Sequence, residues 1–352
     1  MKITKKVNVG GVLLGGGERV KIQSMTTTKT ADVERTVEQI LALQNAGCEI
    51  ARVAVADESD ALAIKAVKER VGIPVVADIH FSPKLAVMAM ESGADKVRIN
   101  PGNIGGEKEI KFVADCVKAH HIPVRVGSNT GSIEKTFLEK YGRNEYALVE
   151  SALYNAGILE KFGVQDIVIS VKASDVPLTV KAYTLLASRG DYPLHVGVTE
   201  AGTTEAGIIK SAVGIGSLLL NGIGDTIRVS LTDDPVKEVY AARRILQACG
   251  LDDAFVEVVS CPTCGRCEWN SMALAEKTSE FVKNFRVKAK VAVMGCVVNG
   301  PGEAKDADLG IAGGSGSCLI FKKGEPYKKV ALECAEEEFF AQLQALVGEK
   351  NG

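Results

Sequence analysis

The first two-thirds of the chain repeat one pattern of apolar and polar positions. A glycine or proline turn precedes a short apolar run, polar residues follow it, and a segment with helical spacing leads to the next turn. We expect a strand in each of eight ranges: 20–26, 48–55, 73–81, 94–100, 122–129, 166–174, 192–202 and 225–232. Apolar strands that alternate with helices are typical of parallel βα units. Eight such units in about 250 residues predict a closed (β/α)8 TIM barrel.

An open, doubly wound sheet is the alternative arrangement of such units. That fold normally carries a glycine-rich fingerprint in its first strand–helix turn, and residues 24–32 (SMTTTKTAD) contain no such motif. We therefore predict a barrel domain over residues 1–250. Residues 251–352 predict a smaller α/β domain, with strands at 253–260 and 289–295 and helices at 268–285 and 331–348.

Polar residues occupy the carboxyl ends of the predicted strands, where barrel enzymes place their chemistry. Several lie two positions apart on one strand and therefore point to the same face. The candidates are Arg52, Asp78, His80, Arg98, Asn100, Arg125, Asn129, Ser170, Lys172, Thr199, Glu200, Arg228 and Ser230. Five of these residues are cations and two are carboxylates, so the expected barrel mouth has a charge of +3 with neutral histidines. His195, in the middle of a predicted strand, is interpreted as a core or supporting histidine.

The charge of the mouth indicates the class of ligand. Lysine and arginine total 42 and aspartate and glutamate 44, which gives the whole chain a formal charge of −2. The cations are thus a local concentration, unlike the basic excess of a nucleic-acid-binding protein. Because guanidinium groups bind phosphate oxygens in pairs, we expect a small polyanion, most simply a diphosphate. Ion pairs with helix carboxylates could explain any one of the arginines, but they are a poor explanation for all five cations.

The sequence also indicates where the protein works. It contains no run of about 18 apolar residues that could span a bilayer, and its first residues, MKITKKVNVGG, lack the apolar segment of a secretory signal. We therefore expect a cytoplasmic protein that binds neither a membrane nor nucleic acid. In a reducing compartment its nine cysteines are expected to be thiols or metal ligands rather than disulfides.

Four cysteines lie close together in the last hundred residues. Cys261, Cys264 and Cys267 follow one predicted strand and Cys296 follows another, after which a Gly-Pro-Gly turn lets Glu303 approach the same place. Three chemistries are open: a four-cysteine zinc site, a redox disulfide between the first two cysteines, and an iron–sulfur cluster with three cysteines and a fourth ligand. The single Cys-x-x-Cys pair favours the cluster, because zinc knuckles usually contain two such pairs.

Long motifs of the chain resemble those of the 4-hydroxy-3-methylbut-2-enyl diphosphate synthase family, iron–sulfur enzymes of the methylerythritol phosphate route to isoprenoids. The motifs are SCPTCGR (260–266), MGCVVNGPGEA (294–304), GIGDTIRVSLT (222–232), QSMTTT (23–28), ADIHF (77–81), VRINPGNIG (97–105), VRVGSN (124–129) and VTEAG (198–202). The resemblance covers essentially the whole chain, in the compact two-domain form of bacterial members.

The resemblance implies a (β/α)8 barrel followed by a domain that binds a 4Fe–4S cluster. It implies that the cluster ligands are Cys261, Cys264, Cys296 and Glu303, whereas Cys267 is not a ligand position of the family. It implies substrate contacts by Arg52, Asp78, His80, Arg98, Asn100, Arg125, Asn129, Lys172, Thr199, Glu200, Arg228 and Ser230. Glu200 is our candidate for proton delivery, and Glu303 is expected to have a catalytic role as a labile ligand.

The implied reaction is the two-electron ring opening and dehydration of 2-C-methyl-D-erythritol 2,4-cyclodiphosphate. Flavodoxin or ferredoxin is the expected electron donor, and a head-to-tail homodimer is the assembly that the family implies. Two other functions stay open on the residues alone. One is a barrel enzyme for another phosphorylated substrate with a structural zinc domain, and the other is a non-catalytic iron–sulfur sensor or carrier. A sensor leaves the five cations of the mouth unexplained.

Overall fold

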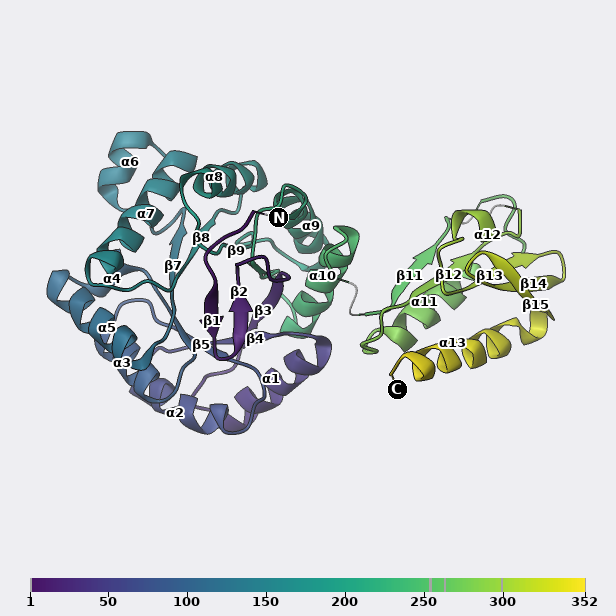
Figure 1. Cartoon of the computed structure of the whole chain (residues 1–352), viewed down its shortest axis with the longest axis horizontal. Coiled ribbons are helices and arrows are strands. Elements are labelled where there is room, and N and C mark those ends of the chain that lie inside the picture. Colours follow the sequence, from purple (N-terminus) through teal and green to yellow (C-terminus); the bar gives the residue numbers. More distant parts are fainter. Residues whose placement is uncertain (1, 253–254, 263, 299, 352) are drawn as a thin grey trace. The chain divides into compact units, whose positions relative to one another are not determined.

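A computed structural model describes residues 2–252, 255–262, 264–298 and 300–351 of the chain. The chain divides into two compact units, Met1–Leu251 and Asp252–Gly352 (Figure 1). In the described ranges no helix is both long and apolar enough to cross a bilayer.

Eight parallel strands form the sheet of the first unit. In sheet order they are β8 (Ile167–Lys172), β7 (Val124–Asn129), β6 (Lys96–Ile99), β5 (Val75–Asp78), β4 (Ile50–Ala54), β3 (Lys21–Met25), β10 (Thr226–Ile227) and β9 (His195–Val196). A parallel bridge between Ile169 and Leu194 joins the two outer strands and closes the sheet. The predicted (β/α)8 barrel is therefore confirmed, and each of the eight expected ranges contains one of its strands.

Helices cover the outside of the barrel (Figure 1). They are α1 (Val33–Ala46), α2 (Glu58–Lys68), α3 (Pro83–Glu91), α4 (Pro101–Ile104), α5 (Glu107–His120), α6 (Lys135–Tyr141), α7 (Glu145–Lys161), α8 (Val176–Arg189), α9 (Thr204–Leu220) and α10 (Pro235–Ala248). Side chains such as Asp57 and Ser82 accept a hydrogen bond from a backbone N–H of the first turn, which fixes where their helices begin. Apolar faces that include Ile40 and Ile64 pack into the barrel core.

A short antiparallel hairpin closes the amino-terminal end of the barrel. It consists of β1 (Val7–Val9) and β2 (Val12–Leu14) and was not predicted from the pattern. Three hairpin residues, Val7, Val9 and Leu14, form one apolar cluster with residues near the starts of three barrel strands. These barrel residues are Ile50, Val76 and Val168. Figure 1 shows the hairpin lying across the ring of strands. Because apolar side chains fill the barrel interior near the starts of these strands, the polar side chains of the interior lie toward the carboxyl ends of the strands.

The second unit is a five-stranded mixed sheet. Its strands are, in order, β11 (Glu257–Ser260), β12 (Lys290–Met294), β13 (Leu309–Gly314), β14 (Ser317–Lys322) and β15 (Glu325–Ala331). The first three are parallel and the last two antiparallel. The first two residues of the expected strand at 253–260 lie outside the described residues.

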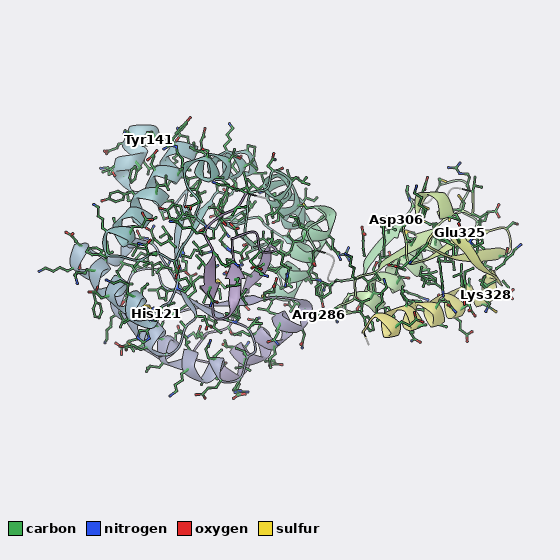
Figure 2. The ribbon with its side chains drawn as sticks, in the orientation of Figure 1. His121, Tyr141, Arg286, Asp306, Glu325 and Lys328 are labelled. Atoms are coloured by element: carbon green, nitrogen blue, oxygen red, sulfur yellow. The ribbon has the colours of Figure 1, made fainter. Side chains whose placement is uncertain are left out.

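Helices pack on both faces of this sheet. One face packs in a cluster with α11 (Ser271–Val282) and α13 (Ala335–Asn351), which a short 3₁₀ turn (Leu332–Cys334) precedes. The other face packs beside α12 (Gly300–Glu303), through the cluster that holds Met294 and Ala304. At the surface, Nζ of Lys328 on β15 lies 2.9 Å from Oε2 of Glu338 on α13, and Lys328 is labelled in Figure 2. The expected helices at 268–285 and 331–348 are thus present, the first shorter at both ends and the second shifted by a few residues.

Candidate functional site

Strand geometry gathers the predicted cations in the barrel interior. Arg98 on β6 lies in register with Arg125 on β7, and Arg52 and Lys172 lie on β4 and β8. Asp78 ends β5. All five side chains belong to residues that are less than a tenth exposed. The predicted mouth therefore exists as a buried cluster of charges, where water screens charges less than it does at the surface.

Asp78 is the anionic centre of this cluster. Its Oδ1 lies 3.1 Å from Nη1 of Arg98, and its Oδ2 lies 3.6 Å from Nε of Arg52. Burial opposes ionisation of the carboxyl, but the charges of Arg52, Arg98 and Arg125 outweigh burial and lower the pKa of Asp78 to about 2. The ionised carboxylate holds both arginines. The side chain of His80 is 58% exposed, and its Nε2 lies 3.9 Å from Oδ2 of Asp78.

A second buried carboxylate, Glu238 on α10, was missed by the sequence analysis. Its Oε2 accepts hydrogen bonds from Ser24 Oγ at 2.9 Å and from Arg228 Nε at 3.2 Å. Its Oε1 accepts from Arg228 Nη2 at 3.3 Å and from the backbone N–H of Leu231 at 3.1 Å. The sequence signal that could have identified Glu238 is its place as an acidic residue on the apolar face of a helix. With Glu238 included, the mouth contains five cations and three carboxylates. Its charge is therefore +2 and not the expected +3.

Arg125 and Lys172 are cations that form no ion pair with a carboxylate of the described residues. In the described parts of the chain, Nε and Nη1 of Arg125 have no hydrogen-bond partner. Burial, followed by repulsion from neighbouring arginines, lowers the pKa of both residues well below their usual range. Because a buried cation is costly without a counter-charge, these two side chains are the groups of the mouth best prepared to bind an anion.

Two glycines make room for the long cationic side chains. A Cβ atom at Gly127 on β7 would lie 3.0 Å from Nε of Arg98, and one at Gly197 would lie 2.7 Å from Nζ of Lys172. Contacts this short would displace the cations. Any larger residue at either position would therefore change the mouth.

The other predicted substrate residues follow or end strands at the same end of the barrel. They are His80, Asn100, Asn129, Thr199, Glu200 and Ser230. Asn100 caps α4, since its Oδ1 accepts from the Gly102 N–H at 3.2 Å, while its Nδ2 has no partner among the described residues. Glu200 is exposed and has a left-handed φ of 52°. Few non-glycine residues adopt this conformation, and it recurs at functional sites.

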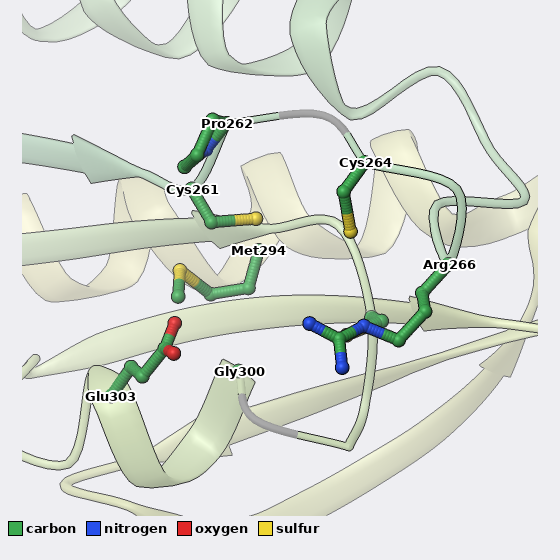
Figure 3. Close-up of a pocket in the computed structure, with 8 residues that line it drawn as sticks. Cys261, Pro262, Cys264, Arg266, Met294, Gly300 and Glu303 are labelled. Carbon is green, nitrogen blue, oxygen red and sulfur yellow. The ribbon is translucent and has the colours of Figure 1, made fainter.

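The four predicted cluster ligands line a single pocket of the second unit. This pocket, of about 170 Å³, is lined by Cys261, Pro262, Cys264, Arg266, Met294, Cys296, Gly300 and Glu303. In Figure 3 the sulfur atoms of Cys261 and Cys264, the guanidinium group of Arg266 and the carboxylate of Glu303 point into the same space. Arg266 was not predicted as a site residue from the sequence, and its backbone and side-chain hydrogen bonds lower the pKa of the Cys264 thiol.

Local backbone structure positions these ligands. Cys261 and Cys296 follow the parallel neighbours β11 and β12, and the Gly295 N–H donates to Cys261 Sγ at 2.9 Å. The Gly300 N–H donates to the carbonyl of Cys296 at 3.2 Å and so starts α12, which carries Glu303. A Cβ atom at Gly300 would lie 2.8 Å from Cβ of Met294, so only glycine lets α12 approach β12 this closely.

Cys267 is not among the residues that line this pocket. Its Sγ lies 3.2 Å from the carbonyl oxygen of Trp269 and 3.3 Å from Oγ of Ser271, at the start of α11. These contacts hold the sulfur at the amino terminus of the helix.

The donor set in the pocket fits an iron–sulfur cluster. Three thiols and one carboxylate face it, and thiolates are the ligands that iron–sulfur clusters require. Within the ranges that the structure describes, no three His, Cys, Asp or Glu side chains gather closely enough to share one metal ion. A structural zinc site needs four donors around one ion, whereas the four irons of a cubane take four separate ligands. The set of three thiols and one carboxylate therefore matches the number of ligands that a cubane takes.

Two sequence profiles match this chain, the GcpE TIM-barrel domain over residues 4–243 and the GcpE protein C-terminal domain over residues 257–345. Curated relatives are named 4-hydroxy-3-methylbut-2-en-1-yl diphosphate synthase (flavodoxin). The relative from Caldanaerobacter subterraneus subsp. tengcongensis is 55% identical over 350 residues, which cover 99% of each chain. The relative from Desulfotalea psychrophila is 53% identical over 347 residues, covering 97% of this chain and 95% of that protein.

Solved structures share the barrel. A truncated 3-deoxy-D-arabino-heptulosonate 7-phosphate synthase from Thermotoga maritima has a TM-score of 0.52 at 16% identity, over 71% of this chain and 95% of that one. Dihydropteroate synthase from Yersinia pestis has a TM-score of 0.51 at 12% identity, over 69% of this chain and 97% of that one. At these identities the likeness shows the fold alone. Since the two profiles and the relatives extend over both units, the chain belongs to the GcpE family.

Proposed function

We propose that this chain is a 4-hydroxy-3-methylbut-2-en-1-yl diphosphate synthase, an iron–sulfur oxidoreductase of the methylerythritol phosphate pathway to isoprenoids. It converts 2-C-methyl-D-erythritol 2,4-cyclodiphosphate to 4-hydroxy-3-methylbut-2-enyl diphosphate and water. One observation carries this function. The same chain has a buried cationic barrel mouth and a pocket lined by three thiols and a carboxylate, and its sequence is 55% identical to a relative of that name.

The mouth is built to bind a diphosphate with little rearrangement. Asp78 already holds Arg52 and Arg98, and Glu238 holds Arg228. Side chains that are ordered before binding lose less conformational entropy on binding. Arg125 and Lys172 have no protein counter-ion in the described residues and would receive one from the substrate. The paired arginines thus supply a fixed frame, and Arg125 and Lys172 supply positive charge that no carboxylate of the described residues pairs with.

The same cations favour the chemical step. Two electrons and one proton convert the dianionic cyclic diphosphate to the trianionic linear diphosphate and one water. Negative charge therefore grows on the phosphate oxygens as the carbon–oxygen bond of the ring breaks. Cations placed in advance around that charge lower the barrier, because they need no reorganisation. Glu200, in the loop after β9, is our proposed donor of the proton that leaves in water.

A 4Fe–4S cluster, when bound, supplies the two electrons one at a time. We propose that Cys261, Cys264 and Cys296 hold it and that Glu303 is the fourth ligand. Cys261 and Cys296 follow the paired strands β11 and β12, which are rigid attachments. Glu303 lies in a single helical turn, and its carboxylate is the harder and weaker ligand for iron. This position is therefore the one from which the protein can withdraw most easily.

We propose flavodoxin as the electron donor, because the relatives carry it in their name. We also propose a head-to-tail homodimer, in which the barrel of one chain works with the cluster domain of the other. Co-expression of Arg125→Met and Cys296→Ser chains tests this assembly. Random pairing restores about a quarter of wild-type activity if the sites are shared between chains. Activity at the background level of the two parent variants contradicts the homodimer.

Anaerobic turnover of the cyclodiphosphate is the decisive experiment for the function. The purified protein, with iron and sulfide content measured, is mixed with substrate and a chemical reductant, and the linear diphosphate is quantified. We expect stoichiometric conversion and no product without reductant. A protein that is fully loaded with iron and sulfide, yet leaves the cyclodiphosphate unchanged, contradicts the function. Replacing the chemical reductant by reduced flavodoxin or ferredoxin then tests the donor.

A further inference from the structure

A second tier of polar side chains lies in the barrel interior beneath the mouth. This inner tier consists of Gln23 on β3, Lys96 on β6, His195 on β9 and Thr226 on β10, and each residue is at most 1% exposed. Lys96 precedes Arg98 by two positions on one strand, so both point into the barrel. His195 and Thr226 are register partners on neighbouring strands. None of these residues has a role in the proposed chemistry.

The polar atoms of the inner tier lack partners. Over the described parts of the chain, Lys96 Nζ, both ring nitrogens of His195, both amide atoms of Gln23 and Oγ1 of Thr226 form no hydrogen bond. More than nine in ten buried polar groups of native proteins are paired. The hairpin cluster that closes the amino-terminal end of the barrel contributes apolar side chains, among them Val7, Val9 and Leu14. The charges that act on Lys96 belong to arginines of the mouth.

Lys96 faces charges of its own sign. Arg125 on β7 and Arg52 on β4 are the charged groups that act on it. His195 on β9 is buried and is subject to the charges of Lys172, Arg125, Lys96 and Arg52, in that order. Val76 on β5, the register partner of Lys96, is apolar. Burial, followed by these two arginines, lowers the pKa of Lys96 to about 7. Near neutral pH the free protein therefore holds Lys96 partly as a neutral amine.

We propose that Lys96 is a positioning residue for the diphosphate, acting from below through Arg125, and that it takes up a proton when the diphosphate binds at the mouth. The inference rests on the proposed function, because it requires a diphosphate at the mouth. Its physical basis is the sign of the charges. An anion above Arg125 offsets the repulsion that keeps Lys96 neutral, so the ammonium becomes the stable form in the complex. Lys96 then adds its charge to the set that stabilises the extra negative charge of the ring-opened product.

Because diphosphate binding is coupled to protonation of Lys96, the affinity for the diphosphate depends on pH. Below the pKa of the free protein Lys96 is already charged, so binding takes up no proton. Above that pKa binding must also protonate the amine, so affinity falls by up to about tenfold per pH unit. The cyclic diphosphate carries only strongly acidic oxygens and does not titrate in this range. A change in affinity with pH therefore comes from the protein.

Calorimetric titration of the anaerobic, cluster-loaded protein with the cyclodiphosphate, without reductant, tests this inference. At about pH 8, titrations in two buffers with different ionisation enthalpies give the number of protons taken up. We expect wild type to take up close to one proton more per site than Lys96→Met, in which a side chain of similar length cannot be charged. We also expect the pH dependence of Kd to flatten in Lys96→Met. Lys210→Met, at an exposed position on α9, is the control and should behave as wild type.

The outcomes separate this inference from the proposed function. Substrate binding with equal proton uptake in wild type and Lys96→Met overturns the role of Lys96 and leaves the function standing. Absence of binding by wild type overturns both. If Lys96→Met does not fold, Lys96→Gln takes its place. The wild-type series also stands alone, since a Kd that does not change between about pH 6.5 and 8.5 overturns the inference without any variant.

Discussion

Glu238 accepts hydrogen bonds from Nε and Nη2 of Arg228, at 3.2 and 3.3 Å. The carboxylate lies on α10 and the guanidinium belongs to the segment after β10, so the pair ties an outer helix of the barrel to its mouth. The same carboxylate accepts from the Leu231 N–H and thereby holds the loop beyond Arg228. The geometry of the mouth therefore depends on a helix residue that lies behind the binding surface.

Glu238→Gln should weaken substrate binding more than it slows turnover. Glutamine keeps the shape but loses the charge that fixes Arg228, and a hydrogen bond to a charged group contributes about 1.5–3 kcal/mol. We expect KM to rise about ten- to hundred-fold, with kcat changed less, in anaerobic steady-state assays. Glu34→Gln, which removes the charge from an exposed pair with Arg70, is the matched control. Equal KM values in the two variants contradict a role for Glu238.

Arg125→Met and Arg98→Met should both lower substrate affinity, but they should differ in stability. Arg98 is paired with Asp78, so its loss leaves a buried carboxylate with fewer partners and should lower Tm. Two nitrogens of Arg125 have no partner in the described chain, so its loss removes an uncompensated charge and should leave Tm unchanged or raised. Calorimetric binding and thermal unfolding measure the two effects, and the cluster spectrum should stay intact. Unchanged affinity in either variant contradicts its contact with the diphosphate.

Glu200→Gln should stop turnover while leaving substrate binding and iron content near wild type. The carboxyl group is needed here for its proton, and a carboxylate beside a diphosphate would otherwise repel it. Single-turnover assays and calorimetry separate the two effects. Glu205→Gln, in the first turn of α9, is the control. Normal turnover with poor binding in Glu200→Gln would reassign this residue to positioning.

Iron content should distinguish the cysteines. Cys261→Ser, Cys264→Ser and Cys296→Ser should each lose the cluster, because each removes a thiolate that faces the pocket. Cys267→Ser should keep iron, spectrum and most activity, since the sulfur of Cys267 is engaged with Trp269 and Ser271. Glu303→Ala should retain some cluster but lose activity. Iron and sulfide analysis under anaerobic conditions decides this, and loss of the cluster in Cys267→Ser with a normal cluster in Glu303→Ala would reverse the assignment.

The barrel was predictable because its strands repeat one pattern with regular turns. The hairpin at Val7–Leu14 was not predicted, although Gly10 and Gly11, both with positive φ, provide the two-residue turn that favours a hairpin. Its strands have three residues each, too few for a clear alternation. β9 and β10 are shorter than the expected ranges 192–202 and 225–232, because the residues after them leave the sheet to form the mouth.

The site was predictable where residues act at strand ends, as Asp78 and Cys296 do. Glu238 and Lys96 escaped because their importance depends on burial among residues distant in sequence. In the sequence, Glu238 has the appearance of an ordinary acidic residue of a first helical turn, and Lys96 that of a polar residue near the start of a predicted strand. For Cys267 the resemblance already implied that it is not a ligand. The structure adds the physical reason, since its sulfur contacts Ser271 at the start of α11 and Cys267 is absent from the residues that line the pocket.

The hairpin also has a consequence for how the protein is made. It is synthesised before every barrel strand, yet the surface that it covers is formed by Ile50, Val76 and Val168. That surface is incomplete until β8 has left the ribosome, about ten to thirty seconds later at usual elongation rates. During this interval the apolar side of the hairpin has nothing to pack against. The hairpin can therefore complete its packing only after strands that are synthesised well after it have been made.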